Sequence, residues 1–114
     1  MAINLGEGPK IPGRVVFVGA DLNARVRLEA VAEELIQVAS LGELSGTPNE
    51  IVVIDLDAAG PDLWAQLQSR PDVAERAVGF YSHVNVELGR QAAESGIRAY
   101  PRGRFWTNLR ELLA

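Results

Sequence analysis

The hydrophobic positions of this chain alternate between two kinds of segment. The first kind is a short, nearly continuous apolar run rich in valine and isoleucine, which is typical of strands covered on both faces. Residues 51–56, IVVIDL, are the clearest example, and residues 14–19, RVVFVG, are similar. Together the apolar runs predict five strands, at residues 14–19, 36–40, 51–56, 77–82 and 97–100.

The second kind of segment places apolar residues three and four positions apart, a spacing that predicts helices with one buried face. Residues 23–35 carry such a stripe, and Asp21 or Asn23 stands where it can cap the helix. The stripe consists of Ala24, Leu28, Val31, Ala32 and Leu35.

Three further helices are predicted, at residues 61–70, 84–96 and 104–114. Pro61 suits the first turn of one of them and Pro71 stops it, while Gly96 closes the next. The last helix carries Phe105, Leu109, Leu112 and Leu113. Residues 41–50 are polar and turn-rich, and they leave room for only a turn or two of helix.

Strands that alternate with helices of about ten residues imply right-handed crossovers and a parallel sheet between two helical layers. We therefore predict an α/β fold of the flavodoxin-like, doubly wound type, with five parallel strands in the order 2-1-3-4-5 and a short or missing second helix. Residues 1–13 hold three glycines and two prolines and predict a loose leader, followed by one domain at residues 14–114.

The predicted strand order also locates a candidate site. Its switch point lies between the first and third strands, and ligands of such folds bind there, beyond the carboxyl ends of the strands. The residues expected nearby are Gly19, Ala20, Asp55, Ser82 and the segment after Tyr100.

The composition narrows the possible functions. The chain has 114 residues and a formal net charge of -4, so no general attraction to nucleic acid or to an anionic membrane is expected. Cysteine is absent and His83 is the only histidine, which leaves no thiolate or multi-histidine metal site, and no cofactor is predicted. No apolar run approaches the roughly 18 residues of a membrane span. Because the first residues also lack a signal-peptide layout, we expect a cytoplasmic protein.

Two stretches resemble one known family. Residues 51–67, IVVIDLDAAGPDLWAQL, combine a buried strand that ends in Asp55 with a turn-rich loop, and residues 79–105 hold a strand, a helix and a second strand. Both resemble response-regulator receiver domains of two-component signalling, in which an aspartate at the end of the third strand accepts a phosphoryl group. The resemblance places Asp55 on that position, Ser82 on the hydroxyl position, Gly96 on a helix end, Tyr100 on an aromatic position and Phe105 on the closing phenylalanine.

The departures from the family pattern concern the metal and the phosphate. Receivers place two adjacent acidic residues at the end of the first strand to hold Mg²⁺, whereas Gly19 and Ala20 stand there in this chain. Mg²⁺ is usually held by several carboxylates and waters. The family's phosphate-pairing lysine and the proline after it fall on Gly103 and Arg104. Since phosphoryl transfer depends on such charge neutralisation, the chain resembles a degenerate member, a pseudo-receiver, in which Asp55 lacks support.

The candidate residues also have structural interpretations. Asp55 is either a phosphoacceptor or a structural acid that accepts backbone N–H groups or pairs with Arg102 or Arg104. Tyr81 competes with Ser82 for the hydroxyl position, because the spacing to the following helix end is one residue shorter than the family's.

Three other features have competing explanations. Gly19 makes either a tight turn or a backbone cradle for an anion. Ser82 and His83 are adjacent, but neighbouring side chains on a strand point apart, so they are not expected to act as a catalytic pair. The arginines of residues 98–104 suit either a phosphate or acidic partner or a solvated face of ion pairs.

This reasoning predicts a stand-alone protein-interaction module without enzymatic activity. The family resemblance implies a docking face on the fourth helix, fifth strand and fifth helix, and the partner is another protein, for which a second copy of this chain is a candidate. The interface candidates are Tyr100, Phe105 and Trp106, and the binding and switch candidates are Ser82, Tyr100, Arg102 and Arg104. The alternatives are a genuine single-domain response regulator phosphorylated on Asp55 and a nucleotide or small-molecule binder at Gly19 and the arginines.

Overall fold

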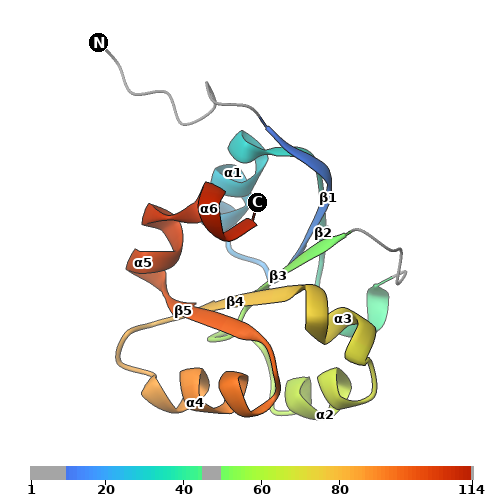
Figure 1. The fold of residues 1–114 in the computed structure, drawn as a ribbon, viewed down its shortest axis with the longest axis vertical. Helices are drawn as coiled ribbons and strands as arrows, with labels where there is room; N and C mark the ends of the chain where they lie inside the picture. The colour runs from blue at the N-terminus through green and yellow to red at the C-terminus, as the bar shows by residue number, and fades with distance from the viewer. Residues whose placement is uncertain (1–9, 45–49, 114) are drawn as a thin grey trace.

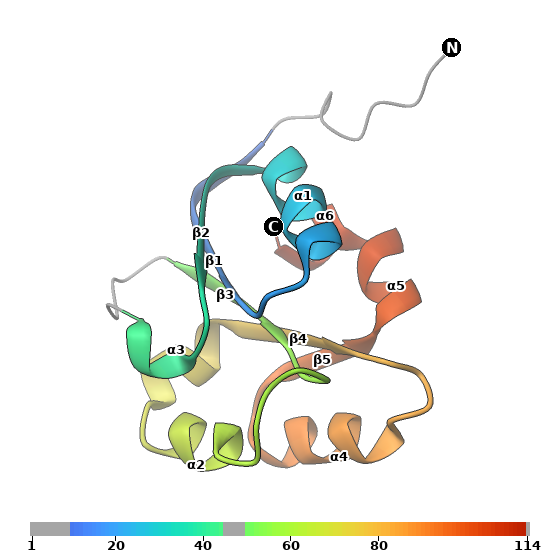
Figure 2. The same ribbon diagram turned by 180° about the vertical axis from the view of Figure 1, so that it is seen from behind.

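Five parallel strands form one sheet in the order β2-β1-β3-β4-β5, which confirms the predicted flavodoxin-like fold class. The computed structural model describes residues 10–44 and 50–113 (Figures 1 and 2). The strands are β1 (Ile11–Val18), β2 (Ala32–Val38), β3 (Ile51–Asp55), β4 (Ala77–Tyr81) and β5 (Arg98–Pro101). The helical elements are α1 (Leu22–Val31), the short 3-10 turn η1 (Leu41–Glu43), α2 (Leu63–Gln68), α3 (Pro71–Arg76), α4 (Val86–Glu94), α5 (Arg102–Thr107) and α6 (Leu109–Leu113).

Each face of the sheet has its own apolar core. Helices α1, α5 and α6 lie on one face, and α2, α3 and α4 lie on the other (Figures 1 and 2). Successive side chains of a strand point to opposite faces. Phe17 and Phe80 therefore pack in the core under α1 and α5, whereas Val18 and Ile54 pack in the core under α2 and α4. This double burial explains why the strands read as nearly unbroken apolar runs.

Two helix ends lie where the sequence predicted them. Asp21 caps α1, because its carboxylate accepts hydrogen bonds from the backbone N–H groups of Asn23 and Ala24. Gly96 follows the end of α4 with a φ of 82°, a left-handed conformation that suits glycine after a helix.

The first helix is shorter than predicted. It ends at Val31, and residues 32–38 form the edge strand β2, so the prediction of a helix to Leu35 was wrong. Leu35 lies opposite Val15 of β1. The segment continues the helical spacing of its apolar residues, but pairing with β1 provides its backbone with hydrogen bonds in an extended conformation and overrides that local preference.

The predicted last helix is two short helices that meet at Asn108. Its backbone N–H and its side-chain Nδ2 both donate to the carbonyl of Arg104, each at 3.1 Å. The side chain of Asn108 thus adds a second donor to the carbonyl that its own N–H already uses, and α5 ends at Thr107. The bend between α5 and α6 borders a hollow that faces α1.

Three smaller differences concern segment boundaries. Strand β1 begins at Ile11, within the predicted leader, and its pairing with β2 is irregular between Ile11 and Arg14. Residues 1–9 of that leader lie outside the described residues. The polar segment predicted to hold a turn or two of helix contains η1, and its residues 45–49 also lie outside. Helix α3 occupies residues 71–76, for which the pattern made no prediction.

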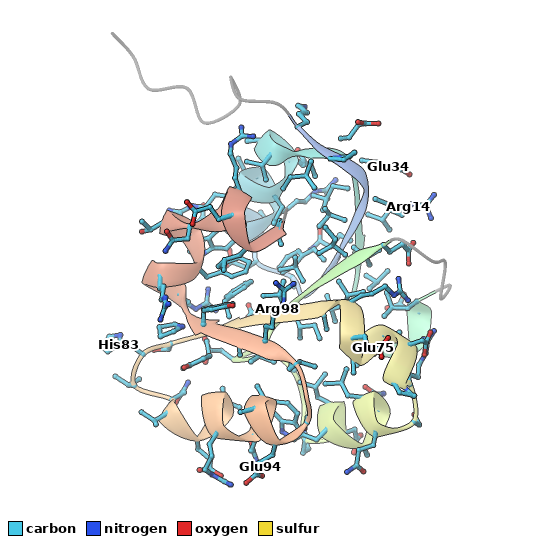
Figure 3. All side chains as sticks on the ribbon, viewed as in Figure 1. Arg14, Glu34, Glu75, His83, Glu94 and Arg98 are labelled. Carbon is cyan, nitrogen blue, oxygen red and sulfur yellow. The ribbon has the colours of Figure 1, made fainter. Side chains whose placement is uncertain are left out.

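An arginine joins the strands near their amino-terminal ends. Arg14 Nε lies 3.1 Å from Oε2 of Glu34, and Arg14 Nη1 lies 3.2 Å from Oε2 of Glu50. Figure 3 labels Arg14 and Glu34 on β1 and β2. Glu50 is only 3% exposed. We call these three residues the Arg14 cluster.

Within residues 10–44 and 50–113, no helix has the length and apolar character that crossing a membrane requires.

Candidate functional site

Arg102 holds three carboxylates at the carboxyl ends of the strands. Its Nη2 lies 3.0 Å from Oδ1 of Asp55, and its Nε lies 3.0 Å from Oδ2 of Asp57. Both contacts are hydrogen bonds. Its Nη1 lies 3.6 Å from Oδ2 of Asp21, which is an ion pair. We call these four residues the Arg102 cluster.

The parallel topology brings the cluster together from distant parts of the chain. Asp55 is the last residue of β3, and Asp21 caps the helix that follows β1. Asp57 lies in the turn after β3, and Arg102 begins α5 directly after β5. The cluster therefore lies at the switch point between β1 and β3, where the strand order places a candidate site.

Asp57 extends the cluster to the loop before α4. Its Oδ2 accepts the backbone N–H of Ser82 at 2.8 Å, and its Oδ1 accepts Nδ2 of Asn85 at 2.7 Å. Together with the bond from Arg102, these contacts engage both carboxylate oxygens. Asp57 thus links the turn after β3 to the β4–α4 loop and to α5.

Aromatic rings support the Arg102 side chain. Its guanidinium carbon lies 4.7 Å from the centroid of Phe80, and the Phe80 centroid lies 5.2 Å from that of Trp106. A guanidinium over an aromatic face gains electrostatic attraction while its edge remains able to donate hydrogen bonds. The core under α1 and α5 therefore positions Arg102 for the carboxylates.

Burial and pairing act in opposite directions on the titration of the cluster. Asp55 is 4% exposed, and this burial raises its pKa above the ordinary value of 3.8, although Arg102 works to lower it. For Arg102, burial works to lower the pKa, but the charges and hydrogen bonds of Asp55 and Asp57 outweigh burial and raise it. Arg102 therefore stays protonated. Since three carboxylates face one guanidinium, the ionised cluster is net negative.

Gly19 allows the chain to pass close to Asp55. A Cβ atom at this position would lie 2.8 Å from Cζ of Phe17 and 3.1 Å from Cβ of Asp55, closer than side chains normally approach. The N–H of Gly19 donates to the carbonyl of Val38 at 3.1 Å, and its carbonyl accepts Nε2 of Gln37 at 2.8 Å. Its N–H is therefore already used within the fold, so it does not cradle an anion in this conformation.

Ser82 and Tyr81, the two candidates for the hydroxyl position, make different contacts. Ser82 joins the cluster through its backbone N–H. The Tyr81 ring lies against α4. Its hydroxyl is so close to Gly89 that a Cβ atom there would lie 2.6 Å from it. His83 is exposed on the outer side of the β4–α4 loop (Figure 3).

The three arginines of residues 98–104 have separate roles. Of these, Arg102 alone pairs with Asp55, which is one of the two pairings that the sequence left open. The exposed Arg104 lies over the ring of Tyr100, its guanidinium carbon 5.6 Å from the centroid. Arg98 donates to the carbonyl of Leu112 at 3.3 Å. The three guanidinium groups therefore contact different partners and do not form one anion site.

The predicted aromatic interface is only partly exposed. Phe105 is 0% exposed and packs against Phe80 with the centroids 5.1 Å apart, so its prediction as an interface residue was wrong. The reason is that α5 lies on the sheet and turns this side chain into the core. Tyr100 and Trp106 are half-buried at the edge of the same core.

The sequence reasoning missed Asp57 and Asn85. Asp57 follows the predicted strand end by two residues, and the Asp-x-Asp spacing from Asp55 is the signal that marks it. Asn85 carried no comparable signal, because it reaches Asp57 only through the turn between β4 and α4.

Comparisons with known proteins give no relative: no family model, curated protein or solved structure matches this chain. Among residues 10–44 and 50–113, no group of three or more acidic or histidine side chains has an arrangement that could hold a metal ion.

Proposed function

We propose that this chain is a receiver-like interaction module. In it, the guanidinium of Arg102 supplies the positive charge beside Asp55 that a metal ion and a lysine supply in a receiver. In this proposal the protein transfers no phosphoryl group. It acts in signalling by docking on another protein.

The contacts of Arg102 carry this proposal. Phosphoryl transfer to an aspartate needs an accessible oxygen and cationic groups that neutralise the transferred charge. Asp55 is 4% exposed, and its Oδ1 already accepts a hydrogen bond from Arg102. Arg102 also serves Asp57 and Asp21. The net negative cluster therefore offers an incoming phosphate no spare positive charge.

The end of β1 adds no free metal ligand beside Asp55. Gly19 and Ala20 have no oxygen-bearing side chains, and Asp21 is occupied with the cap of α1 and with Arg102. A bound Mg²⁺ would have to displace the guanidinium and break two hydrogen bonds of 3.0 Å.

The docking face in this proposal comprises α4, β5 and α5. Val84 in the loop before α4 and Val86 at its first position are each 71% exposed, and large exposed apolar side chains suit a partner surface. Next to it, Arg104 of α5 lies over the ring of Tyr100 of β5. Since Asp57 bonds the loop that carries Val84 and precedes Val86, the cluster keeps this part of the face in one conformation.

Amide NMR with Mg²⁺ and beryllofluoride, which mimics a phosphoryl group on aspartate, tests the inert site. We expect no saturable shifts at Asp57, Ser82 or Arg102, and the Asp55→Asn variant should give the same spectrum changes as the native chain. A saturable response that Asp55→Asn abolishes would establish a genuine receiver and overturn the proposal.

Concentration-dependent light scattering tests docking between copies of the chain. Arg104→Glu should weaken any association of the native chain, whereas Arg25→Glu on α1, outside the docking face, should not. Association that Arg25→Glu weakens and Arg104→Glu leaves unchanged would place the interface elsewhere.

A further inference from the structure

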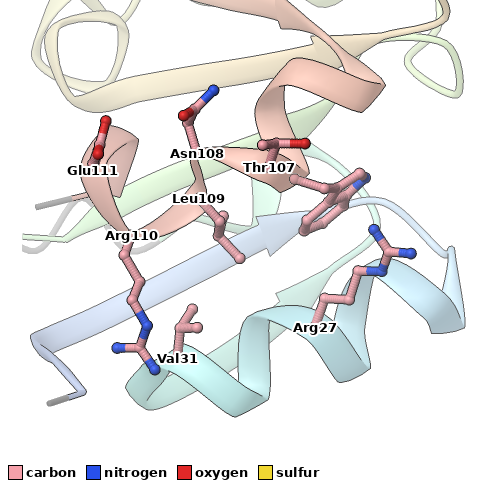
Figure 4. Close-up of a pocket in the computed structure, with 8 residues that line it drawn as sticks. Arg27, Val31, Thr107, Asn108, Leu109, Arg110 and Glu111 are labelled. Atoms are coloured by element: carbon pink, nitrogen blue, oxygen red, sulfur yellow. The ribbon is translucent and has the colours of Figure 1, made fainter. Parts of the chain in front are cut away.

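The bend at Asn108 wraps the chain around a hollow of about 220 Å³ between α1 and α5–α6 (Figure 4). Six consecutive residues, 106–111, line it together with Arg27 and Val31 of α1. In a straight helix successive side chains turn by about 100°, so six in a row do not face one space. The hollow is therefore a product of the break between the two short helices.

Part of the wall of this hollow is apolar, and an arginine stands at one end. Val31, Leu109 and the ring of Trp106 supply the apolar surface. Arg27 rises from α1 toward α5 (Figure 4), and its guanidinium carbon lies 5.2 Å from the centroid of Trp106. Arg110 and Glu111 line the part contributed by α6.

Arg27 differs from its neighbour on the same helix. Arg25 pairs with Glu29, with Nε 2.8 Å from Oε1. Arg27 takes part in none of the ion pairs found within residues 10–44 and 50–113. An aromatic ring positions its guanidinium instead, which leaves the N–H donors able to bind an anion in the bidentate way that arginine favours.

We propose that this hollow binds a small aromatic carboxylate. The ring of the ligand lies against Trp106 and Leu109, and its carboxylate accepts hydrogen bonds from Arg27. An apolar cavity of about 150 Å³ is large enough for benzene, so about 220 Å³ has room for one ring with its acid group. No residue of the Arg102 cluster lines this hollow, and the inference does not depend on the proposed docking function.

Benzoate is the probe, and the two tryptophans of the chain report on it. Trp106 lines the hollow, whereas Trp64 on α2 packs against the core of the opposite face. In an NMR titration, the indole N–H signal of Trp106 should shift with half-saturation at about 1 mM benzoate or below, while that of Trp64 stays in place. Acetate lacks the ring and benzyl alcohol lacks the charge, so each should bind at least about tenfold more weakly.

Arg27→Gln separates specific recognition from nonspecific contact. Arg27 is exposed, so this variant should fold, and it should weaken benzoate binding at least about tenfold because a charge-assisted hydrogen bond is lost. Arg25→Gln is the matched control and should bind as the native chain does. Equal binding by Arg27→Gln and the native chain, equal binding of benzyl alcohol and benzoate, or no shift of Trp106 would each overturn the proposal.

Discussion

An arginine and a buried carboxylate meet at both ends of the sheet, in different surroundings. The Arg14 cluster lies toward the amino-terminal ends of the strands, and the Arg102 cluster lies at the carboxyl ends. The two arginine side chains are similarly exposed, at 35% and 33%. Each pairs with one of the two buried charged residues among the described residues, Glu50 at 3% and Asp55 at 4%.

The difference lies in what the partners are attached to. In the Arg14 cluster, Glu34 belongs to β2 and Glu50 directly precedes β3, so the arginine connects parts of one rigid sheet. In the Arg102 cluster, Asp57 lies in a turn and bonds onward to the β4–α4 loop. A buried ion pair therefore does not by itself mark a functional site. The Arg102 cluster differs because it is bonded to loops, and functional residues commonly lie on loops that a rigid scaffold positions.

Removing the central arginine of the Arg102 cluster should have the largest effect. We expect Arg102→Ala to destabilise the fold by about 3–5 kcal/mol in urea unfolding at neutral pH, because it leaves buried Asp55 beside Asp57 without a cation. Arg104→Ala is the control two residues away, and it should cost below about 1 kcal/mol. Equal losses for the two variants would contradict the role given to Arg102.

Removing the arginine of the Arg14 cluster should destabilise the fold less than removing Arg102. Arg14→Ala leaves one buried carboxylate, Glu50, since its other partner Glu34 is 53% exposed and is readily hydrated. We expect a loss of about 2–3 kcal/mol by the same measurement. Arg25→Ala, which breaks an exposed pair on α1, should cost below about 0.5 kcal/mol and serves as the comparison. A larger loss for Arg14→Ala than for Arg102→Ala would reverse the ranking of the two ends.

Close packing around Asp55 should make Gly19 sensitive to a single methyl group. Gly19→Ala brings a Cβ against Phe17 and Asp55, and we expect a loss of about 1–2 kcal/mol in thermal or urea unfolding. Gly103→Ala, at the start of α5, meets nothing within 4 Å and should be neutral or slightly stabilising. Tolerance of alanine at Gly19 would show that the segment after β1 can move away from the cluster.

The smallest expected effect is the contribution of Asp55 to the pH dependence of stability. A carboxyl whose pKa is higher in the folded than in the unfolded protein binds its proton more tightly when folded. Its favourable contribution is therefore complete below the ordinary pKa of 3.8 and declines as pH rises from there through the raised pKa of the folded state. Asp55→Asn lacks this titration, so the free energy of unfolding of the native chain should fall relative to the variant over that interval. A relative rise would show that pairing with Arg102 outweighs burial.

The fold followed from the sequence wherever apolar residues were decisive. The runs at residues 51–56 and 77–82 gave two central strands, because only double burial explains so many adjacent apolar residues. Residues 32–38 were misassigned in part, since AEELIQV has helix-forming residues and its strand conformation depends on contact with β1. The break between α5 and α6 at Asn108, where a side-chain hydrogen bond occurs, is not encoded in the apolar spacing.

The sequence predicted where the candidate site lies but only some of the residues that form it. Strand order places Asp55 and Arg102 at one end of the sheet. Whether Arg102 or Arg104 pairs with Asp55 depends on how α5 is rotated about its own axis, which the sequence pattern does not give. That rotation directs Phe105 into the core and Arg104 outward over Tyr100. Asp57 and Asn85 meet across loops, where no periodicity links sequence to position.

The interior place of β1, between β2 and β3, has a consequence for the synthesis of the protein. This strand is made first, yet its neighbours in the sheet are β2 and β3. A nascent chain can pair one edge of β1 with β2 early, but the other edge stays open until residues 51–55 have left the ribosome. During that interval an apolar strand presents unpaired backbone groups, the condition in which chains associate wrongly. Pairing with β3 is what closes this second edge of β1.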